Sequence, residues 1–162
     1  MAWDKNFASK YLHIHLFGMK KGIPLPCMCA NVRRAARVMT QIYDEALRPE
    51  GLRSTQFSIL QALSIAAPIL QGELGELLAL DPTAVTRTVQ LLRKRGWIKV
   101  APGKDRRERW LSLSAAGEAE LERVNALWET AQSEMKRRLG RERWNQLLAL
   151  SIEIAKMAAV PE

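Results

Sequence analysis

Cysteine and histidine are both scarce in this sequence, with two residues of each among 162. Two cysteines so close together, Cys27 and Cys29, build no disulfide framework, and this predicts a protein of the reducing cytoplasm. No apolar run approaches the length that crosses a membrane. The sequence also holds no nucleophile paired with a base, no glycine-rich phosphate loop and no metal-hydrolase motif. We therefore expect neither a membrane protein nor an enzyme, and no cofactor.

Positive charge is concentrated in one short part of the chain. The net charge is +8, and residues 82–109 alone carry nine basic and two acidic side chains. A charge that served solubility would be spread along the sequence. The concentration therefore indicates a docking surface for a polyanion, either nucleic acid or an acidic membrane surface.

Apolar residues recur at helical spacing along most of the chain, which predicts a mainly α fold. Hydrophobic residues make up 48% of the sequence, enough for one domain over residues 31–162 to bury a core. Residues 1–30 show weak periodicity and are predicted to form an N-terminal extension, with Met19 and Met28 as alternative natural starts. The predicted helices cover residues 31–47, 55–66, 71–78, 82–95, 114–139 and the segment after Gly140. Residues 97–101 and 109–113 alternate as short strands do.

Residues 81–97, DPTAVTRTVQLLRKRGW, hold a complete set of helix signals. Asp81 is a good N-cap, because its carboxylate can accept from the free N–H groups of the first turn. Pro82 suits the first helical position, and Gly96 supplies the left-handed residue that ends the helix. The apolar side chains recur on one face, which we expect to be buried: Val85, Val89 and Leu92.

Polar and basic side chains occupy the remaining surface of this helix: Thr83, Thr86, Arg87, Gln90, Arg93 and Lys94. A short helix and a tight turn precede it, so the segment reads as a helix-turn-helix. The exposed part of such a second helix meets base edges and phosphates in the major groove. Arginine there reads guanine, and threonine contacts a phosphate or a thymine methyl group. Taken alone, the same pattern also fits an amphipathic helix with a solvated basic face.

A basic hairpin follows directly. The turn signal Pro102–Gly103 joins the two expected strands, and the loop after it reads KDRRE. A hairpin in this place is a wing, whose arginines can enter the neighbouring minor groove, where the potential is most negative. Together with the concentrated charge, the hairpin favours DNA binding over a merely solvated face.

Three segments resemble the MarR family of bacterial winged helix-turn-helix regulators: GLRSTQFSILQAL, LGELLALDPTAVTRTVQLLRKRGWI and DRRERWLSLSAAGEAEL. The most specific part is the wing pattern, met here by Asp105, Arg107, Leu111, Leu113, Ser114 and Gly117. In that family the wing aspartate holds the arginine for minor-groove contact, so the resemblance assigns these roles to Asp105 and Arg107. Arg106 is expected at or near the tip of the wing. The resemblance implies a winged helix-turn-helix lobe at residues 55–113.

The resemblance also implies a homodimer built from the terminal helices, residues 31–48 and 114–160. The predicted helix after Ser114 is long, about 36 Å at 1.5 Å per residue, and it carries an apolar stripe. A two-fold dimer would read a pseudo-palindromic operator with half-sites about 34 Å apart. The alternative is a monomer whose helices pack internally.

Relatives in the family bind a small effector, often an aromatic acid, between the dimer helices and the DNA-binding lobe. The distance between the two recognition helices of such a dimer decides whether they fit the operator. An effector that binds more tightly when this distance does not fit therefore releases the DNA. Such a repressor is the function that we expect. The candidate ligand residues are Tyr43, Phe57 and Trp128, although aromatic residues at helical spacing are more often ordinary core.

Two alternatives stay open. Cys27 and Cys29 are candidates for redox sensing, helped by nearby arginines and a helix N-terminus, or for metal binding with His13 and His15, although the C-x-C and H-x-H spacing is not that of zinc fingers. The other alternative is an architectural DNA-binding protein, which would bind scrambled DNA as well as any operator.

Overall fold

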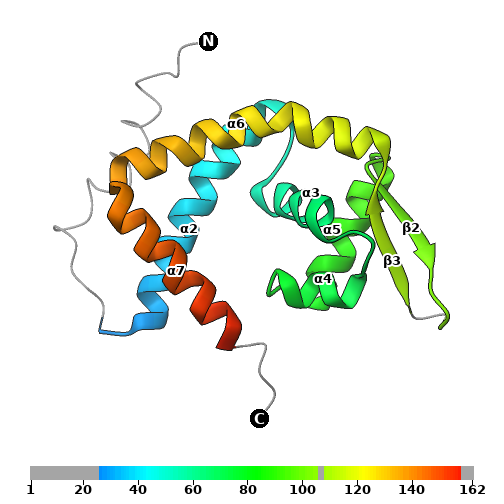
Figure 1. Ribbon diagram of the computed structural model, residues 1–162, viewed down its shortest axis with the longest axis horizontal. Helices are drawn as coiled ribbons and strands as arrows, with labels where there is room; N and C mark the ends of the chain where they lie inside the picture. Colours follow the sequence, from blue (N-terminus) through cyan, green and yellow to red (C-terminus); the bar gives the residue numbers. More distant parts are fainter. Residues whose placement is uncertain (1–25, 106–107, 158–162) are drawn as a thin grey trace. The chain divides into compact units, whose positions relative to one another are not determined.

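The computed structural model describes residues 26–105 and 108–157 (Figure 1). The chain divides into two compact units, Met1–Met39 and Thr40–Glu162. Helix α2 begins in the first unit and ends in the second, and every later element belongs to the second unit. In chain order the elements are α2 (Met28–Leu47), the 3-10 turn η1 (Arg48–Glu50), α3 (Ser54–Ala66), β1 (Ile69–Leu70), α4 (Gln71–Leu77), α5 (Pro82–Lys94), β2 (Ile98–Pro102), β3 (Arg109–Leu113), α6 (Ala115–Leu139) and α7 (Arg141–Met157).

The predicted fold class is confirmed: the chain is mainly helical and carries a β-hairpin between α5 and α6. Each predicted helix lies within three residues of its expected bounds. The sheet has a third strand that the sequence did not predict, because β1 pairs antiparallel with β3 and gives the order β1-β3-β2. Two residues are too few for an alternating pattern, so only the pairing of Ile69 with Leu111 reveals this strand.

One hydrophobic core joins α3, α4, α5, the sheet and α6. The predicted buried face of α5 is confirmed, and α3 also buries one face. The members of both faces are at most 3% exposed: Phe57, Leu60, Leu63, Val85, Val89 and Leu92. Burying a side chain of this size contributes about 2 kcal/mol, and three of them on one face fix the rotation of α5 about its axis. Helix α4 buries Leu74, whereas Leu77 is 58% exposed at the end of the helix.

The turn between α4 and α5 depends on a close approach of the two helices. A Cβ atom on Gly75 would lie 3.3 Å from Cγ2 of Val85, so a larger residue would push the helices apart. The Leu80 N–H donates to the Gly75 carbonyl at 2.9 Å. Ala79 holds the left-handed conformation, with φ of 49°. These features confirm the tight helix-turn-helix connection.

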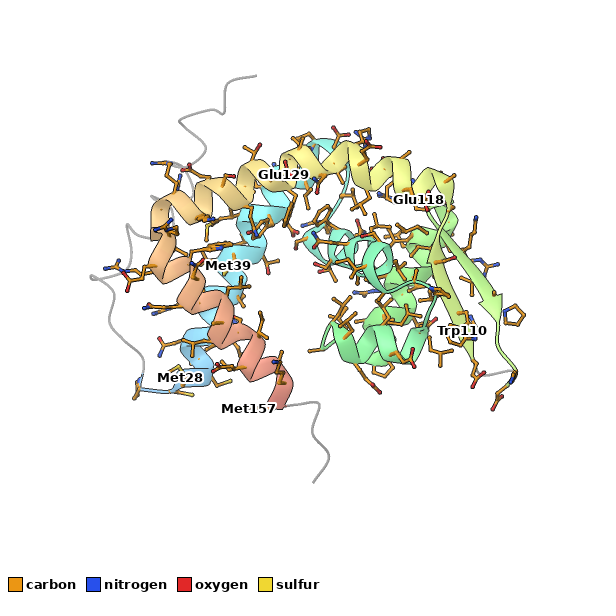
Figure 2. All side chains as sticks on the ribbon, viewed as in Figure 1. Met28, Met39, Trp110, Glu118, Glu129 and Met157 are labelled. Carbon is orange, nitrogen blue, oxygen red and sulfur yellow. The ribbon has the colours of Figure 1, made fainter. Side chains whose placement is uncertain are left out.

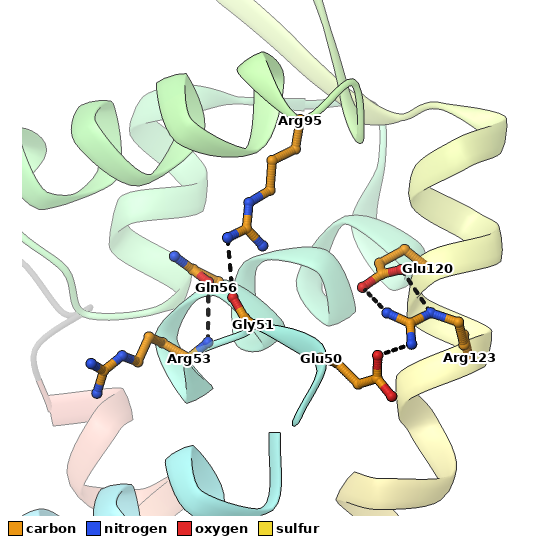
Figure 3. A network of polar contacts seen from close by, with 7 residues as sticks. All are labelled: Glu50, Gly51, Arg53, Gln56, Arg95, Glu120 and Arg123. Atoms are coloured by element: carbon orange, nitrogen blue, oxygen red, sulfur yellow. Dashed lines mark hydrogen bonds and ion pairs between the residues drawn. The ribbon is translucent and has the colours of Figure 1, made fainter. Parts of the chain in front are cut away.

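The segment between α2 and α3 is fastened to both α5 and α6 (Figure 3). Arg95 donates to the Gly51 carbonyl at 3.0 Å, and Arg123 of α6 bonds Glu50 and Glu120. Leu52, next in the chain, is 1% exposed. These bonds hold the start of α3 against the C-terminal end of α5 and so fix the position of that end of α5.

The last two helices differ in how much they bury. Helix α6 buries Val124, Ala131 and Met135, as its apolar stripe predicts. Helix α7 packs beside α6 but has no buried residue over its 17 described residues. Within the described ranges, no helix combines the length and the apolar character needed to cross a membrane.

Candidate nucleic-acid interface

Helix α5 starts where the sequence predicts. Oδ1 of Asp81 accepts from the backbone N–H groups of Thr83 and Ala84, at 3.0 and 2.9 Å. Pro82 occupies the first helical position. The chain leaves the helix at Gly96, whose φ is 78°. These local interactions fix the ends of α5, and the buried stripe described above fixes its rotation.

The polar face of α5 points away from the core. Five of the six predicted DNA-binding residues on this helix are exposed, namely Thr83, Arg87, Gln90, Arg93 and Lys94, and Thr86 is half-buried. Within the described part of the chain, the side chains of Arg87, Arg93 and Lys94 form no ion pair and no hydrogen bond. Their charges are therefore uncompensated, and their donors are free to meet phosphates or base edges.

Thr86 is the exception on this face, because its hydroxyl group is already engaged. It donates to the Pro82 carbonyl at 2.8 Å and accepts from Nε2 of Gln71 at 3.0 Å. Gln71 is the first residue of α4 and was missed from the sequence. No local pattern points to it, since 15 residues separate it from Thr86.

The basic residues after α5 do not all serve the outer face. The guanidinium of Arg95 lies 4.8 Å from the ring centre of Trp97, in addition to its bond to Gly51. A guanidinium stacked on an aromatic ring and bonded to a carbonyl is a packing element. Part of the positive charge of this region therefore holds the lobe together, and the remainder is available to a partner.

The wing has the predicted hairpin geometry. Strands β2 and β3 pair from Ile98 with Leu113 up to Pro102 with Arg109. Lys99, Lys104, Asp105 and Arg109 are exposed along it, and Trp110 of β3 is 37% exposed (Figure 2). The predicted contact residues Arg106 and Arg107 lie outside the described residues, so their roles stay predictions.

Glu108 organises the tip of the wing, which the sequence did not indicate. Its Oε2 accepts from the backbone N–H of Lys104 at 3.1 Å and of Asp105 at 3.4 Å. Its carbonyl accepts from the Gly103 N–H at 3.0 Å. A Cβ atom on Gly103 would lie 2.4 Å from Cβ of Glu108, so this close approach requires glycine at position 103.

The base of the wing is joined to the end of α5 and the start of α6. The Ser114 hydroxyl donates to the Gly96 carbonyl at 2.5 Å and accepts from the Gly117 N–H at 3.0 Å. A Cβ atom on Gly117 would lie 2.1 Å from the Trp97 carbonyl oxygen. The serine and glycine of the wing pattern therefore have a structural reason: they hold the end of α5, the wing and the start of α6 in one arrangement.

Comparison with known proteins gives this arrangement a family. A model of the MarR family matches residues 50–108. The HTH-type transcriptional regulator YwoH of Bacillus subtilis is 33% identical over 95 residues, which are 59% of this chain and 69% of YwoH. The chain belongs to the MarR family. The multiple antibiotic resistance protein MarR of Escherichia coli is 31% identical over 88 residues, 54% of this chain and 61% of that protein.

Solved MarR-family structures share the fold. The transcriptional regulator MosR of Mycobacterium tuberculosis, crystallised in complex with DNA, is 34% identical, with a TM-score of 0.73 over 82% of this chain and 96% of that chain. Apo MarR of E. coli, at 23% identity, has a TM-score of 0.66 over 81% of this chain and 98% of that chain. MarR-family proteins are transcription regulators and not enzymes, so this chain is a transcription regulator with a winged helix-turn-helix.

The three aromatic residues predicted to contact an effector differ in burial: Phe57 is buried, whereas Tyr43 and Trp128 are half-buried. Phe57 is 2% exposed and its ring stacks on that of Trp128, with the ring centres 5.7 Å apart. Tyr43 is half-buried, and its hydroxyl donates to Oε1 of Gln132 on α6. Burial raises the pKa of Tyr43 above 10.0, which keeps this hydroxyl protonated and able to donate. Phe57 has a full role in the core without a ligand.

Both cysteines are exposed at the beginning of α2. The residues that the structure describes contain no group of three His, Cys, Asp or Glu side chains placed to hold a metal ion. His13 and His15 lie outside the described residues. Redox sensing and metal binding through Cys27 and Cys29 stay predictions.

Proposed function

We propose that this MarR-family chain is a cytoplasmic, dimeric, sequence-specific repressor that a small ligand releases from a pseudo-palindromic operator. The observation that carries the proposal is the outward face of α5, where Arg87, Arg93 and Lys94 have no partner among the described residues. Three cations without a partner among the described residues repel one another, and an anionic partner relieves this repulsion.

Specific reading, beyond attraction to phosphate, is supported by the other side chains of that face. Thr83 and Gln90 are exposed beside Arg87, and side chains of these types form hydrogen bonds to base edges in the major groove. MosR, at 34% identity, was crystallised with DNA. A mixed polar and basic face of this kind favours a sequence-specific regulator over an architectural protein, for which phosphate contacts alone would suffice.

The dimer is supported by the exposed apolar side chains of α7. Six of its residues are between 38% and 76% exposed in the single chain: Leu147, Leu148, Leu150, Ile152, Ile154 and Met157. They run to Met157 at the end of the helix (Figure 2). Apolar surface of this extent usually marks an interface, and a second copy of the chain is the partner that symmetric assembly supplies.

The effector site that we propose lies near Tyr43 and Trp128, with Phe57 stacked beneath Trp128. Tyr43 and Trp128 are half-buried, so each keeps surface that an aromatic acid can contact. A ligand bound there releases DNA if it binds more tightly to the dimer whose α5 helices lie at a distance that does not fit the operator.

Replacing Arg87 tests the proposal. The probe is the duplex that the full chain enriches from a randomised library, compared with a scrambled duplex of the same length. We expect R87A to weaken binding to the enriched duplex by about tenfold or more, since a good base contact discriminates by about 1–3 kcal/mol.

The matched control is R137A. It also removes one positive charge, but Arg137 lies on α6 and is paired with Glu134, so its binding should stay within about twofold of the wild type. Wild-type affinity of R87A for the enriched duplex would remove α5 as the reader. Equal affinity of the wild type for both duplexes would instead indicate an architectural protein.

A further inference from the structure

The hydrogen bond between Gln71 and Thr86 joins the beginning of α4 to the edge of the exposed face of α5. Nε2 of Gln71 donates to Oγ1 of Thr86 at 3.0 Å, and both residues are half-buried. Thr86 lies one helical turn from Thr83 and from Gln90, which are exposed on that face. A side chain from outside α5 is therefore bonded to a residue of the face that we propose to meet DNA.

The contact is not needed to pack the two helices together. Leu74 of α4 and Val85 of α5 are each at most 1% exposed in the core, and Gly75 already sets the close approach of the helices. The Gln71 side chain lies at the edge of this packed region. The hydrogen bond from Gln71 therefore affects Thr86 and not the packing of the two helices.

Threonine within a helix divides between two side-chain rotamers, because its hydroxyl can bond a carbonyl of the preceding turn. A second hydrogen bond that fits only one rotamer selects it. In this structure the Thr86 hydroxyl has both bonds, to the Pro82 carbonyl and from Gln71. The single hydroxyl proton is used in the first bond, so none remains for a phosphate or a base acceptor. Thymine presents no hydrogen-bond donor in the major groove, so the group that Thr86 can still offer to a thymine is its methyl.

We propose that Gln71 is a positioning residue for DNA recognition: it fixes Thr86 so that the threonine methyl, and not the hydroxyl, meets the DNA. Apolar contact with the 5-methyl group of thymine is the recognition that such a methyl provides in the major groove. Gln71 itself does not touch the base. The inference rests on the proposed function, because it requires that α5 lie in the major groove.

The experiment removes thymine methyl groups one at a time. Single thymines of the enriched duplex are replaced by uracil, which deletes the 5-methyl and keeps the base pair. We expect wild-type affinity to fall about fivefold at one thymine of each half-site, a change that corresponds to roughly 1 kcal/mol. T86S, which keeps the hydroxyl but lacks the methyl, should bind the thymine and uracil duplexes equally. T86V keeps a methyl in its single preferred helical rotamer and should retain the preference.

Gln71 is tested by Q71M, which has a similar length but no donor. We expect Q71M to lose the thymine preference while its affinity for scrambled DNA and its thermal unfolding stay unchanged. The same substitution in the T86V background should have no effect, because valine has no hydroxyl to orient. A residue that only supports the fold would lower stability and binding to every duplex in both backgrounds.

Each outcome decides the inference. Loss of the preference in Q71M, but not in Q71M/T86V, supports it. The inference is overturned if the thymine preference survives in Q71M, is lost in T86V, or is absent from the wild type. If R87A weakens binding as expected while uracil has no effect at any position, only the role of Gln71 is wrong. If the wild type does not discriminate the enriched from the scrambled duplex, the proposed function is wrong and this inference with it.

Discussion

Arginine has three different roles in this lobe, and the neighbours of each guanidinium decide which one it takes. Arg87 has no partner among the described residues and faces outward from α5. Arg95, eight residues later, stacks on Trp97 and bonds a backbone carbonyl. Arg123 is held between two carboxylates, and its hydrogen bonds to Glu120 and Glu50 raise its pKa further. Only the first kind is free to bind DNA.

Asp44 shows how one carboxylate at the end of α2 fixes the start of α3. Its Oδ1 accepts from the backbone N–H and the hydroxyl of Ser54, each at 2.7 Å, and its Oδ2 accepts from Arg53 at 3.2 Å. Partial burial alone would raise the pKa of Asp44, but these hydrogen bonds outweigh it and hold the pKa below 3.8. The ionised form is therefore favoured by folding.

The pKa direction predicts how D44N behaves with pH. A carboxylate whose folded pKa is lowered contributes its full stability above its unfolded pKa of about 3.9 and loses it as the pH falls through the folded value. We expect D44N to lower the free energy of unfolding by about 1 kcal/mol at pH 7, as for other caps of helix N–H groups, and by much less at pH 3. Urea unfolding at both pH values measures this, and an equal deficit at both would contradict it.

At the scale of elements, the wing shows how a short hairpin presents a defined tip. Five paired positions hold β2 and β3 together. Beyond them, the Glu108 carboxylate binds two N–H groups of the loop, and Gly103 leaves the room that Glu108 requires. Residues 103–105 and Glu108 are therefore held together before the wing meets DNA, which reduces the entropy that they lose on binding.

Substituting Gly103 tests this role of the tip. In G103A the added Cβ overlaps Glu108, so Glu108 must move and its bonds to the N–H groups of Lys104 and Asp105 are lost. We expect binding to the enriched duplex to weaken about fivefold, with thermal unfolding little changed, because the tip buries no core residue. Fluorescence anisotropy measures the affinity. The control is G72A, where a Cβ would meet nothing within 4 Å. Full-strength binding by G103A would show that the contact between Gly103 and Glu108 is not needed.

The elements that the sequence predicted are those whose signals are local. Asp81 and Gly96 mark the ends of α5 by interactions within a few residues, and the spacing of Val85 and Val89 reports the buried face. The contacts that it did not predict join distant residues: Gln71 with Thr86, and Arg95 with a carbonyl 44 residues earlier. Which distant residues become partners depends on how the helices pack against one another. The spacing of apolar residues along the sequence carries no information about this packing.

The candidate site divides in the same way. The outward stripe of α5 follows from helical geometry once the buried face is known, and the structure places it as expected. That Thr86 lacks a free proton, that Glu108 closes the wing and that Arg95 is a packing residue were not predictable, because each depends on a hydrogen bond or stacking contact made by folding.

At the scale of the whole molecule, the proposed function places DNA binding and pairing with a second copy on different elements. The basic face belongs to α5 and the wing, whereas the exposed apolar residues belong to α7, which packs on α6. Ser114 and Gly117 join the wing to α6 at its first turn. In a dimer formed through α7, this rigid joint would let the interface set the distance between the two α5 helices. That distance is the quantity that an effector has to change.

The most direct measurement is the selection itself, followed by the stoichiometry of the complex. The wild-type chain is incubated with a randomised duplex library, the enriched sites are sequenced, and the number of chains per site is determined by analytical ultracentrifugation. We predict a two-fold symmetric site, with half-site centres about one helical turn or 10 base pairs apart, bound by two chains. The absence of any enriched sequence, or one chain bound to a site without symmetry, would contradict the account.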